Sequence, residues 1–243
     1  MRAELIEIDS QIFGRNVLAI HDFDIYSDFA AFERSYVAPH APAYVSCKVP
    51  VENIAGIHAL EDAGFRFVEC QIRSSIKLRK THDTSPYRYS FERVTSEEDL
   101  AAVLEIGGAT FLHDRFRADP CYSPGDSGRR YQAYVAQSFR SPDEAVYRLI
   151  DGSNGNTVAF KTHRYVSPTE VLFLLGGVHP DFKNLGLGLI NEYFEFNELI
   201  RKGINRGVTH ISASNYPVFN LEIGHLGFHV MTTFAVLRKV YNC

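Results

Sequence analysis

The feature that most constrains this sequence is a glycine-containing turn, Val178–Gly188, which separates two apolar patterns. Apolar residues fill Val171–Leu175, as expected for a buried strand, and a helical pattern covers Leu189–Arg201. A strand that turns directly into a helix predicts a layered fold of helices packed on a sheet. The first turn of that helix has unpaired backbone N–H groups and a positive dipole end. Because glycine lets a ligand approach these groups closely, the turn indicates a site for phosphate or pyrophosphate.

The remaining patterns predict an α/β chain of α+β character with a mixed sheet. Strands are expected at 44–49, 65–78, 145–150, 157–163, 171–178, 208–212 and 228–240. Helices are expected at 54–63, 131–139, 189–201 and 218–225, with a further helix that starts after Ser96 and stalls at Gly107-Gly108. A polar, aperiodic stretch at Lys80–Tyr87 predicts a boundary between a smaller α/β portion, residues 1–85, and a larger domain, residues 86–243.

Two segments of the chain resemble each other, Asn53–Phe65 and Asn215–Phe228. Each consists of an asparagine, a predicted short helix and a Gly-Phe pair that leads into a strand. The similarity predicts two related α/β halves, of which only the second carries the glycine turn. The alternative is that the unit recurs because a helix ended by glycine before a strand is common.

Three types of phosphate-binding loop can be compared with this turn. A Walker loop places a lysine and a hydroxyl residue after its second glycine, whereas Leu189-Ile190 follow here. A dinucleotide-binding loop has a third glycine or alanine where Asn191 stands. The spacing Val-x-Pro-x-x-Lys-x-x-Gly-x-Gly, from Val178 to Gly188, instead resembles the acyl-CoA loop of the GCN5-related N-acetyltransferase (GNAT) superfamily. Lys183 replaces the Gln or Arg that is usual in that loop.

The GNAT resemblance covers Glu92–Arg238 and implies a GNAT-like acyl-CoA fold with splayed central strands, preceded here by a smaller, partial GNAT-like portion. It implies acetyl-CoA as co-substrate, with its pyrophosphate on the loop amides. A backbone N–H near Gly177 or Val178 is the implied donor to the oxyanion. The residues implied for acetyl-CoA binding are Gly177, Val178, Lys183, Asn184, Leu185, Gly186, Leu187, Gly188 and Asn215.

Two shorter segments resemble the TDP-fucosamine acetyltransferase-like branch of the superfamily. Asp9–Gly14 resembles its Asp-Ser-x-x-Phe-Gly opening, and Asp114–Pro120 resembles its Ser-Arg-Phe-x-x-Asp-Pro stretch, with Asp114 in place of serine. That branch acetylates the 4-amino group of a dTDP-linked amino sugar, so the resemblance implies a nucleotide sugar as the small-molecule amine acceptor. An amino acid, a polyamine, an antibiotic or a protein N-terminus stays open as acceptor, as does a non-catalytic acyl-CoA-binding protein.

The implied reaction needs a base for the amine and an acid for the leaving thiolate. The superfamily's usual acid is a tyrosine four residues before the Gly-Phe pair, but Ile223 stands there, beside Glu222, because the segment is one residue longer. We therefore predict Tyr216 as the acid and Glu170 as the base, with His179 as a second candidate base, although each also has a purely structural interpretation. Candidates for binding the phosphates of a nucleotide sugar are Arg115, Arg117, Arg129 and Arg130.

Composition excludes several other classes. A net charge of −4 and a pI near 6.2 give no electrostatic basis for binding nucleic acid or an anionic membrane. The sequence has no apolar run of transmembrane length, and its N-terminus lacks the apolar core of a signal peptide. Cys47, Cys70, Cys121 and Cys243 are widely spaced, which argues against a disulfide framework or structural zinc. We expect a cytoplasmic enzyme without a metal, and whether it forms a homodimer is open.

Overall fold

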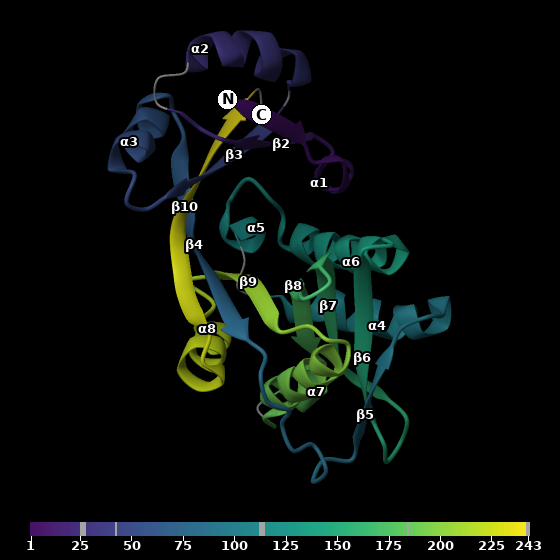
Figure 1. Ribbon diagram of the computed structural model, residues 1–243. Coiled ribbons are helices and arrows are strands. Elements are labelled where there is room, and N and C mark those ends of the chain that lie inside the picture. The colour runs from purple at the N-terminus through teal and green to yellow at the C-terminus, as the bar shows by residue number, and fades with distance from the viewer. Residues whose placement is uncertain (25–27, 42, 112–114, 184, 242–243) are drawn as a thin grey trace.

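The computed structural model describes residues 1–24, 28–41, 43–111, 115–183 and 185–241, and its strands form one ten-stranded sheet (Figure 1). The strands are β1 (Arg2–Leu5), β2 (Asn16–His21), β3 (Ala43–Pro50), β4 (Arg66–Lys77), β5 (Tyr89–Arg93), β6 (Glu144–Asp151), β7 (Thr157–Ser167), β8 (Glu170–Val178), β9 (Arg206–Ser212) and β10 (His229–Tyr241). The α-helices are α1 (Glu7–Phe13), α2 (Phe29–Phe32), α3 (Ile54–Asp62), α4 (Glu97–Thr110), α5 (Arg115–Ala118), α6 (Pro124–Arg140), α7 (Leu187–Arg201) and α8 (Tyr216–Phe219). The π-helices are η1 (Glu33–Val37) and η4 (Asn220–Leu226), and the 3₁₀ helices are η2 (Ala38–His40) and η3 (Pro180–Phe182).

The sheet has the order β1-β2-β3-β10-β4-β9-β8-β7-β6-β5. β2 pairs with β3, and β8 with β9, in parallel, while the other neighbouring pairs are antiparallel. The long C-terminal strand β10 runs between β3 and β4, so the end of the chain lies beside its first part (Figure 1). Strands from both sides of residue 85 thus share one sheet, and the division into 1–85 and 86–243 stays a prediction.

Two ends of this sheet have separate apolar cores. Around β2, β3 and β10, the buried side chains include Leu18, Val45 and Leu237, which pack with Leu60 of α3. At the other end, α4 and α6 cover one face of β6 and β7, and α7 packs on the opposite face. No helix in the described part of the chain combines the length and the apolar composition that a membrane span requires.

The central strands β8 and β9 separate after a short parallel contact. Their paired register covers only Glu170–Leu172 of β8 and Arg206–Val208 of β9, although β8 continues to Val178. At this junction the ring of Phe173 packs against Gly207, where a Cβ would lie 2.1 Å from a ring carbon. The predicted mixed α/β sheet with splayed central strands is therefore confirmed.

Helix α4 shows that one prediction was wrong. The helix does not stall at Gly107-Gly108 but continues to Thr110. Gly108 lies where α4 packs closely against α6, because a Cβ on Gly128 of α6 would lie 2.7 Å from the carbonyl oxygen of Gly108. Glycine weakens a helix in isolation, but helix packing outweighs that cost here.

The sequence patterns also missed several elements. Helix α6 begins at Pro124 rather than at 131, since Ser123 and Asp126 form a capping box before a proline in the first turn. The first strands, β1 and β2, and the short edge strand β5 were not predicted. Their patterns are short, and β1 and β5 alternate only between partly buried and exposed side chains.

The two similar segments form the same local unit. Asn53 and Asn215 each cap a short helix by accepting a hydrogen bond from a backbone N–H of its first turn. Gly64 and Gly227 both have left-handed φ values, 87° and 79°. The strands that follow them, β4 and β10, pair side by side. This recurrence supports the predicted relationship between the halves, which stays a prediction.

Candidate active site

A cavity of about 490 Å³ opens where β8 and β9 separate. Residues 173–178 of β8 and 209–212 of β9 line it, and the start of α7 contributes Gly188, Asn191 and Glu192. Beyond Leu172 and Val208 the facing edges of these strands are not paired with each other. A ligand in this space would therefore meet main-chain groups of a strand edge as well as a helix N-terminus.

The glycine turn at this helix start folds as the sequence predicted. Gly186 is the N-cap of α7 and has a φ of 74°, a left-handed conformation that favours glycine. Leu187 anchors the turn by packing into the core below it. A Cβ on Gly188 would have Leu221 at 3.7 Å as its one contact within 4 Å among the described residues outside its own helix backbone. A ligand can therefore approach closely at Gly188, beside the N–H groups that begin α7.

Most of the residues predicted for acetyl-CoA binding converge on this cavity. Those that line it are Gly177, Val178, Lys183, Gly188 and Asn215. Leu185 instead points outward with 65% of its surface exposed, and Gly186 and Leu187 shape the turn without lining the cavity. Gly177 also has a packing role, because a Cβ there would lie 2.7 Å from the Phe160 ring. Asn184 lies outside the described residues.

The structure does not bring the predicted catalytic residues to the cavity. Tyr216 follows the N-cap of α8 and has 68% of its surface exposed. Glu170 accepts a hydrogen bond from Nη1 of Arg206 at 2.9 Å, at the end where β8 and β9 still pair. His179 accepts a hydrogen bond from the backbone N–H of Asp181 at 3.3 Å. Tyr216, Glu170 and His179 are all absent from the described lining of the cavity.

The exposure of Tyr216 leads to a prediction that tests its proposed role as the acid. We expect Tyr216→Phe to leave turnover of acetyl-CoA within about twofold of wild type, because exposed side chains away from a site contribute little. Release of free thiol measures this turnover. A loss of about 100-fold or more would instead support Tyr216 as the acid.

The two segments that resemble the TDP-fucosamine branch lie against each other beside the cavity. Asp9 of α1 accepts a hydrogen bond from Nε of Arg130 of α6 at 2.8 Å. Phe13 stacks on Phe116, with ring centroids 5.4 Å apart. Arg115, Phe116 and Arg130 line the cavity. Asp9 and Phe13 of the first portion thus contact lining residues of the second portion, while residues 112–114 of the second segment lie outside the described residues.

Three cationic side chains that line the cavity, Lys48, Arg115 and Arg130, lie close to one another. Of the four predicted arginines, Arg115 and Arg130 line it, whereas Arg129 pairs with Asp126 on the surface and Arg117 lies elsewhere. Lys48 of β3 joins Arg115 and Arg130 there. Loss of contact with water lowers the pKa of Lys48 to about 8, and the positive charge of Arg115 adds to this shift. Lys48 therefore still carries its charge at neutral pH.

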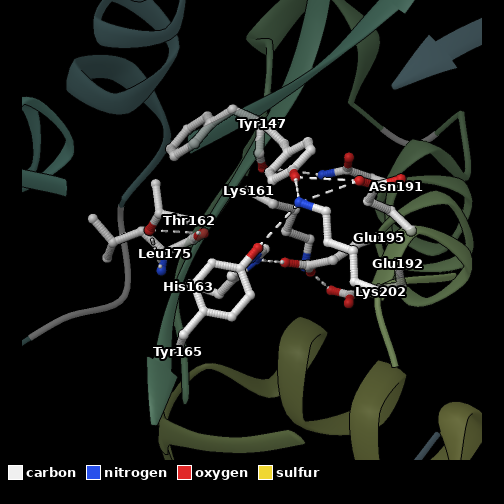
Figure 2. Close-up of polar contacts among 12 residues, drawn as sticks. Tyr147, Lys161, Thr162, His163, Tyr165, Leu175, Asn191, Glu192, Glu195 and Lys202 are labelled. Carbon is white, nitrogen blue, oxygen red and sulfur yellow. Dashed lines mark hydrogen bonds and ion pairs between the residues drawn. The ribbon is translucent and has the colours of Figure 1, made fainter. Parts of the chain in front are cut away.

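Sequence reasoning missed a cluster of buried charges beside the cavity, which Figure 2 shows. Lys161 of β7 forms ion pairs with Glu192 and Glu195 of α7, and Nδ1 of His163 lies 3.0 Å from Oε1 of Glu195. Burial lowers the pKa of Lys161, but the two carboxylates outweigh that effect and raise it, so the ammonium stays charged. A sequence signal existed, because 161 and 163 share a strand face and 192 and 195 share a helix face.

Glu222 of η4 also lines the cavity, and only 8% of its surface is exposed. Burial, followed by Glu192, raises its pKa to about 8, with Glu195 adding to the shift and Lys161 opposing it. Its Oε2 atom is buried and has no hydrogen-bond partner in the described part of the chain. Glu222 therefore holds a proton at neutral pH, while its neighbour Ile223 packs into the core on the other side.

The raised pKa of Glu222 predicts a pH-dependent stability. The folded protein keeps this proton up to about pH 8, whereas the unfolded chain loses it near pH 4.5. The contribution of this group to stability is therefore complete below pH 4.5 and is lost as pH rises through 8. Glu222→Gln removes this titration. From pH 6 to pH 9, the variant's free energy of unfolding should therefore gain about 2–3 kcal/mol relative to that of wild type. Thermal melts at both pH values would show no such gain if the carboxyl were ionised in the fold.

Among curated proteins, the sequence is 25% identical over 134 residues to the dTDP-fucosamine acetyltransferase of Escherichia coli O6:H1. This match covers 55% of the present chain and 57% of the relative, so the chain spans little more than half the length of this relative. No protein-family profile matches the chain.

Solved structures resemble the protein over both portions of the chain. A GCN5-related N-acetyltransferase from Sphaerobacter thermophilus matches with a TM-score of 0.66 and 13% identity, over 98% of this chain and 76% of that one. A tandem GNAT protein from the clavulanic acid biosynthesis pathway matches with a TM-score of 0.63 and 12% identity, over 95% and 77%. A GCN5-related N-acetyltransferase from Kribbella flavida matches with a TM-score of 0.59 and 14% identity, over 93% and 82%. Together these comparisons confirm the predicted resemblance, and the chain has the fold of the GCN5-related N-acetyltransferase superfamily.

Proposed function

We propose that the protein is an N-acetyltransferase that uses acetyl-CoA to acetylate the amine of a nucleotide-linked amino sugar. The observation that carries this proposal is the cavity between β8 and β9, which ends at the glycine-containing start of α7. Such a cavity offers a strand edge to the extended pantetheine arm of acetyl-CoA and a helix N-terminus to its pyrophosphate.

The chain's own groups suit acetyl-CoA at this position. The N–H groups at the first turn of α7 would bind its phosphates, and Lys183 on the cavity wall adds a positive charge. The absence of a side chain on Gly188 keeps this approach open. A backbone N–H at Gly177 or Val178 stays our candidate for stabilising the oxyanion of the thioester carbonyl.

Support for a nucleotide sugar comes from three cationic side chains on the cavity lining. Lys48, Arg115 and Arg130 place positive charge there, where two phosphates of a nucleotide would need it. The wall that carries Arg115 is built from the segments that resemble the TDP-fucosamine branch, and the curated relative is named a dTDP-fucosamine acetyltransferase. Glu69, whose charge acts on Lys48, also lines the cavity and favours an acceptor that carries an amine.

An assay of thiol release from acetyl-CoA tests the proposal, with dTDP-fucosamine as the first acceptor. We expect turnover that depends on this acceptor and falls when salt screens its phosphates. Turnover with spermidine or amino acids but not with dTDP-fucosamine would contradict the acceptor. Binding of acetyl-CoA without turnover on any amine would favour a non-catalytic acyl-CoA-binding protein.

A further inference from the structure

We infer that Glu222 is the catalytic acid of this site, which gives its proton to the sulfur atom that leaves acetyl-CoA. This inference rests on the proposed function. It concerns a residue that the sequence analysis did not select, and it replaces Tyr216 in that role.

Glu222 lines the cavity from η4. Val218 of α8 and Leu221 of η4 also line the cavity and are apolar. Glu222 is therefore the titratable group among the lining residues that α8 and η4 contribute.

The π-helical geometry of η4 accounts for this placement. In a π-helix each backbone hydrogen bond spans five residues instead of the four of an α-helix, and single π-helical turns are frequent at functional sites. In η4 the register directs Glu222 to the cavity and Ile223 to the apolar core with Phe228. Ile223 is partly buried against that core and is absent from the described lining of the cavity.

Lys161 and Glu192, which also line the cavity, are bound to each other in an ion pair. Glu222 differs, since its Oε2 has no partner among the described residues although Glu222 is more than nine-tenths buried. A buried polar atom without a partner is costly, so a ligand that contacts it would relieve that cost.

The charges around Glu222 favour its protonated form. Glu192 and Glu195 from α7 and Lys161 from β7 are the charged groups that act on it. Lys161 is already balanced by its ion pairs with the two glutamates (Figure 2). Burial and the nearby carboxylates therefore keep a proton on Glu222 until about pH 8. A carboxylic acid that stays protonated at neutral pH is suited to donate to a developing thiolate.

Glu222 gives up one proton in this reaction and regains one. The amine nitrogen bonds to the carbonyl carbon, and the carbon–sulfur bond breaks with its electron pair on sulfur. Glu222 gives its proton to that sulfur, which leaves as the free thiol. The Glu222 carboxylate then takes the proton that the acylated nitrogen loses, so the products are an amide and a thiol and the enzyme returns to its starting state.

Glu222→Gln tests the inference, with Glu105→Gln on the exposed face of α4 as the control. We measure kcat for thiol release from acetyl-CoA with dTDP-fucosamine, and acetyl-CoA affinity by calorimetry. Glu222→Gln should lower kcat by about 100-fold or more and leave affinity within about threefold, because the amide keeps the shape but carries no acidic proton. Wild-type kcat should fall as pH rises through about 8, and this limb should be missing in the variant.

The outcomes separate this inference from the function on which it rests. Glu222→Gln with wild-type kcat and an unchanged alkaline limb would remove Glu222 from the role while leaving an acetyltransferase. Loss of acetyl-CoA affinity in the variant would also overturn it, since Glu222 would then act in binding. A wild-type protein that binds acetyl-CoA but acetylates neither dTDP-fucosamine nor a panel of amines would overturn the proposed function and this inference with it.

Discussion

Gly188→Glu is expected to weaken acetyl-CoA binding by more than about 100-fold, or about 3 kcal/mol. Gly188 lies in the first turn of α7 and lines the cavity, and among the described residues outside its helix backbone only Leu221 would lie within 4 Å of a Cβ there. A glutamate at this position would fill the space proposed for the pyrophosphate and would also repel its negative charge. Calorimetric titration of the variant with acetyl-CoA measures the loss.

The chain offers a matched control for this substitution. Gly125 occupies the second position of α6, as Gly188 does in α7, and a Cβ there would meet nothing within 4 Å. Gly125 does not line the cavity. Gly125→Glu should therefore bind acetyl-CoA as wild type does. Equal affinities for Gly188→Glu and wild type would contradict the proposed loop.

The second large effect is expected at Lys161. Its ammonium is the cation between the buried carboxylates of Glu192 and Glu195. Lys161→Met would leave both carboxylates buried without that partner, so we expect the free energy of unfolding to fall by about 3–5 kcal/mol. Adding Glu192→Gln to Lys161→Met should restore part of this loss, because one buried carboxylate is then neutral.

Chemical denaturation of the single and double variants measures these values. Lys80→Met, on an exposed lysine outside the cluster, serves as the control and should stay within about 0.5 kcal/mol of wild type. A Lys161→Met protein as stable as wild type would show that the cluster is not held by this cation.

Local signals predicted the geometry of the glycine turn well, while its role in binding acyl-CoA stays a prediction. The glycine turn needs a left-handed residue at Gly186 and an open approach at Gly188, and both requirements are visible in a single segment. Most of the strand and helix positions followed from periodicity for the same reason. The splayed strands came from the resemblance, since the unpaired edge beyond Leu172 depends on contacts between β8 and β9 that no single segment contains.

The catalytic residues were harder to predict because their properties come from tertiary surroundings. Tyr216 has suitable chemistry in sequence, but its position at the start of α8 leaves it exposed. Glu222 was visible only as a neighbour of Ile223, and the π-helical register of η4 is what directs it to the cavity. Its raised pKa arises from burial and from Glu192 on another helix, which the local sequence does not reveal.

The most direct test of the central claim is a calorimetric titration of the wild-type protein with acetyl-CoA. We expect binding with a micromolar Kd and a one-to-one stoichiometry, lost in Gly188→Glu and kept in Gly125→Glu. Failure to bind at millimolar acetyl-CoA would contradict the claim, because the glycine turn would then serve packing alone.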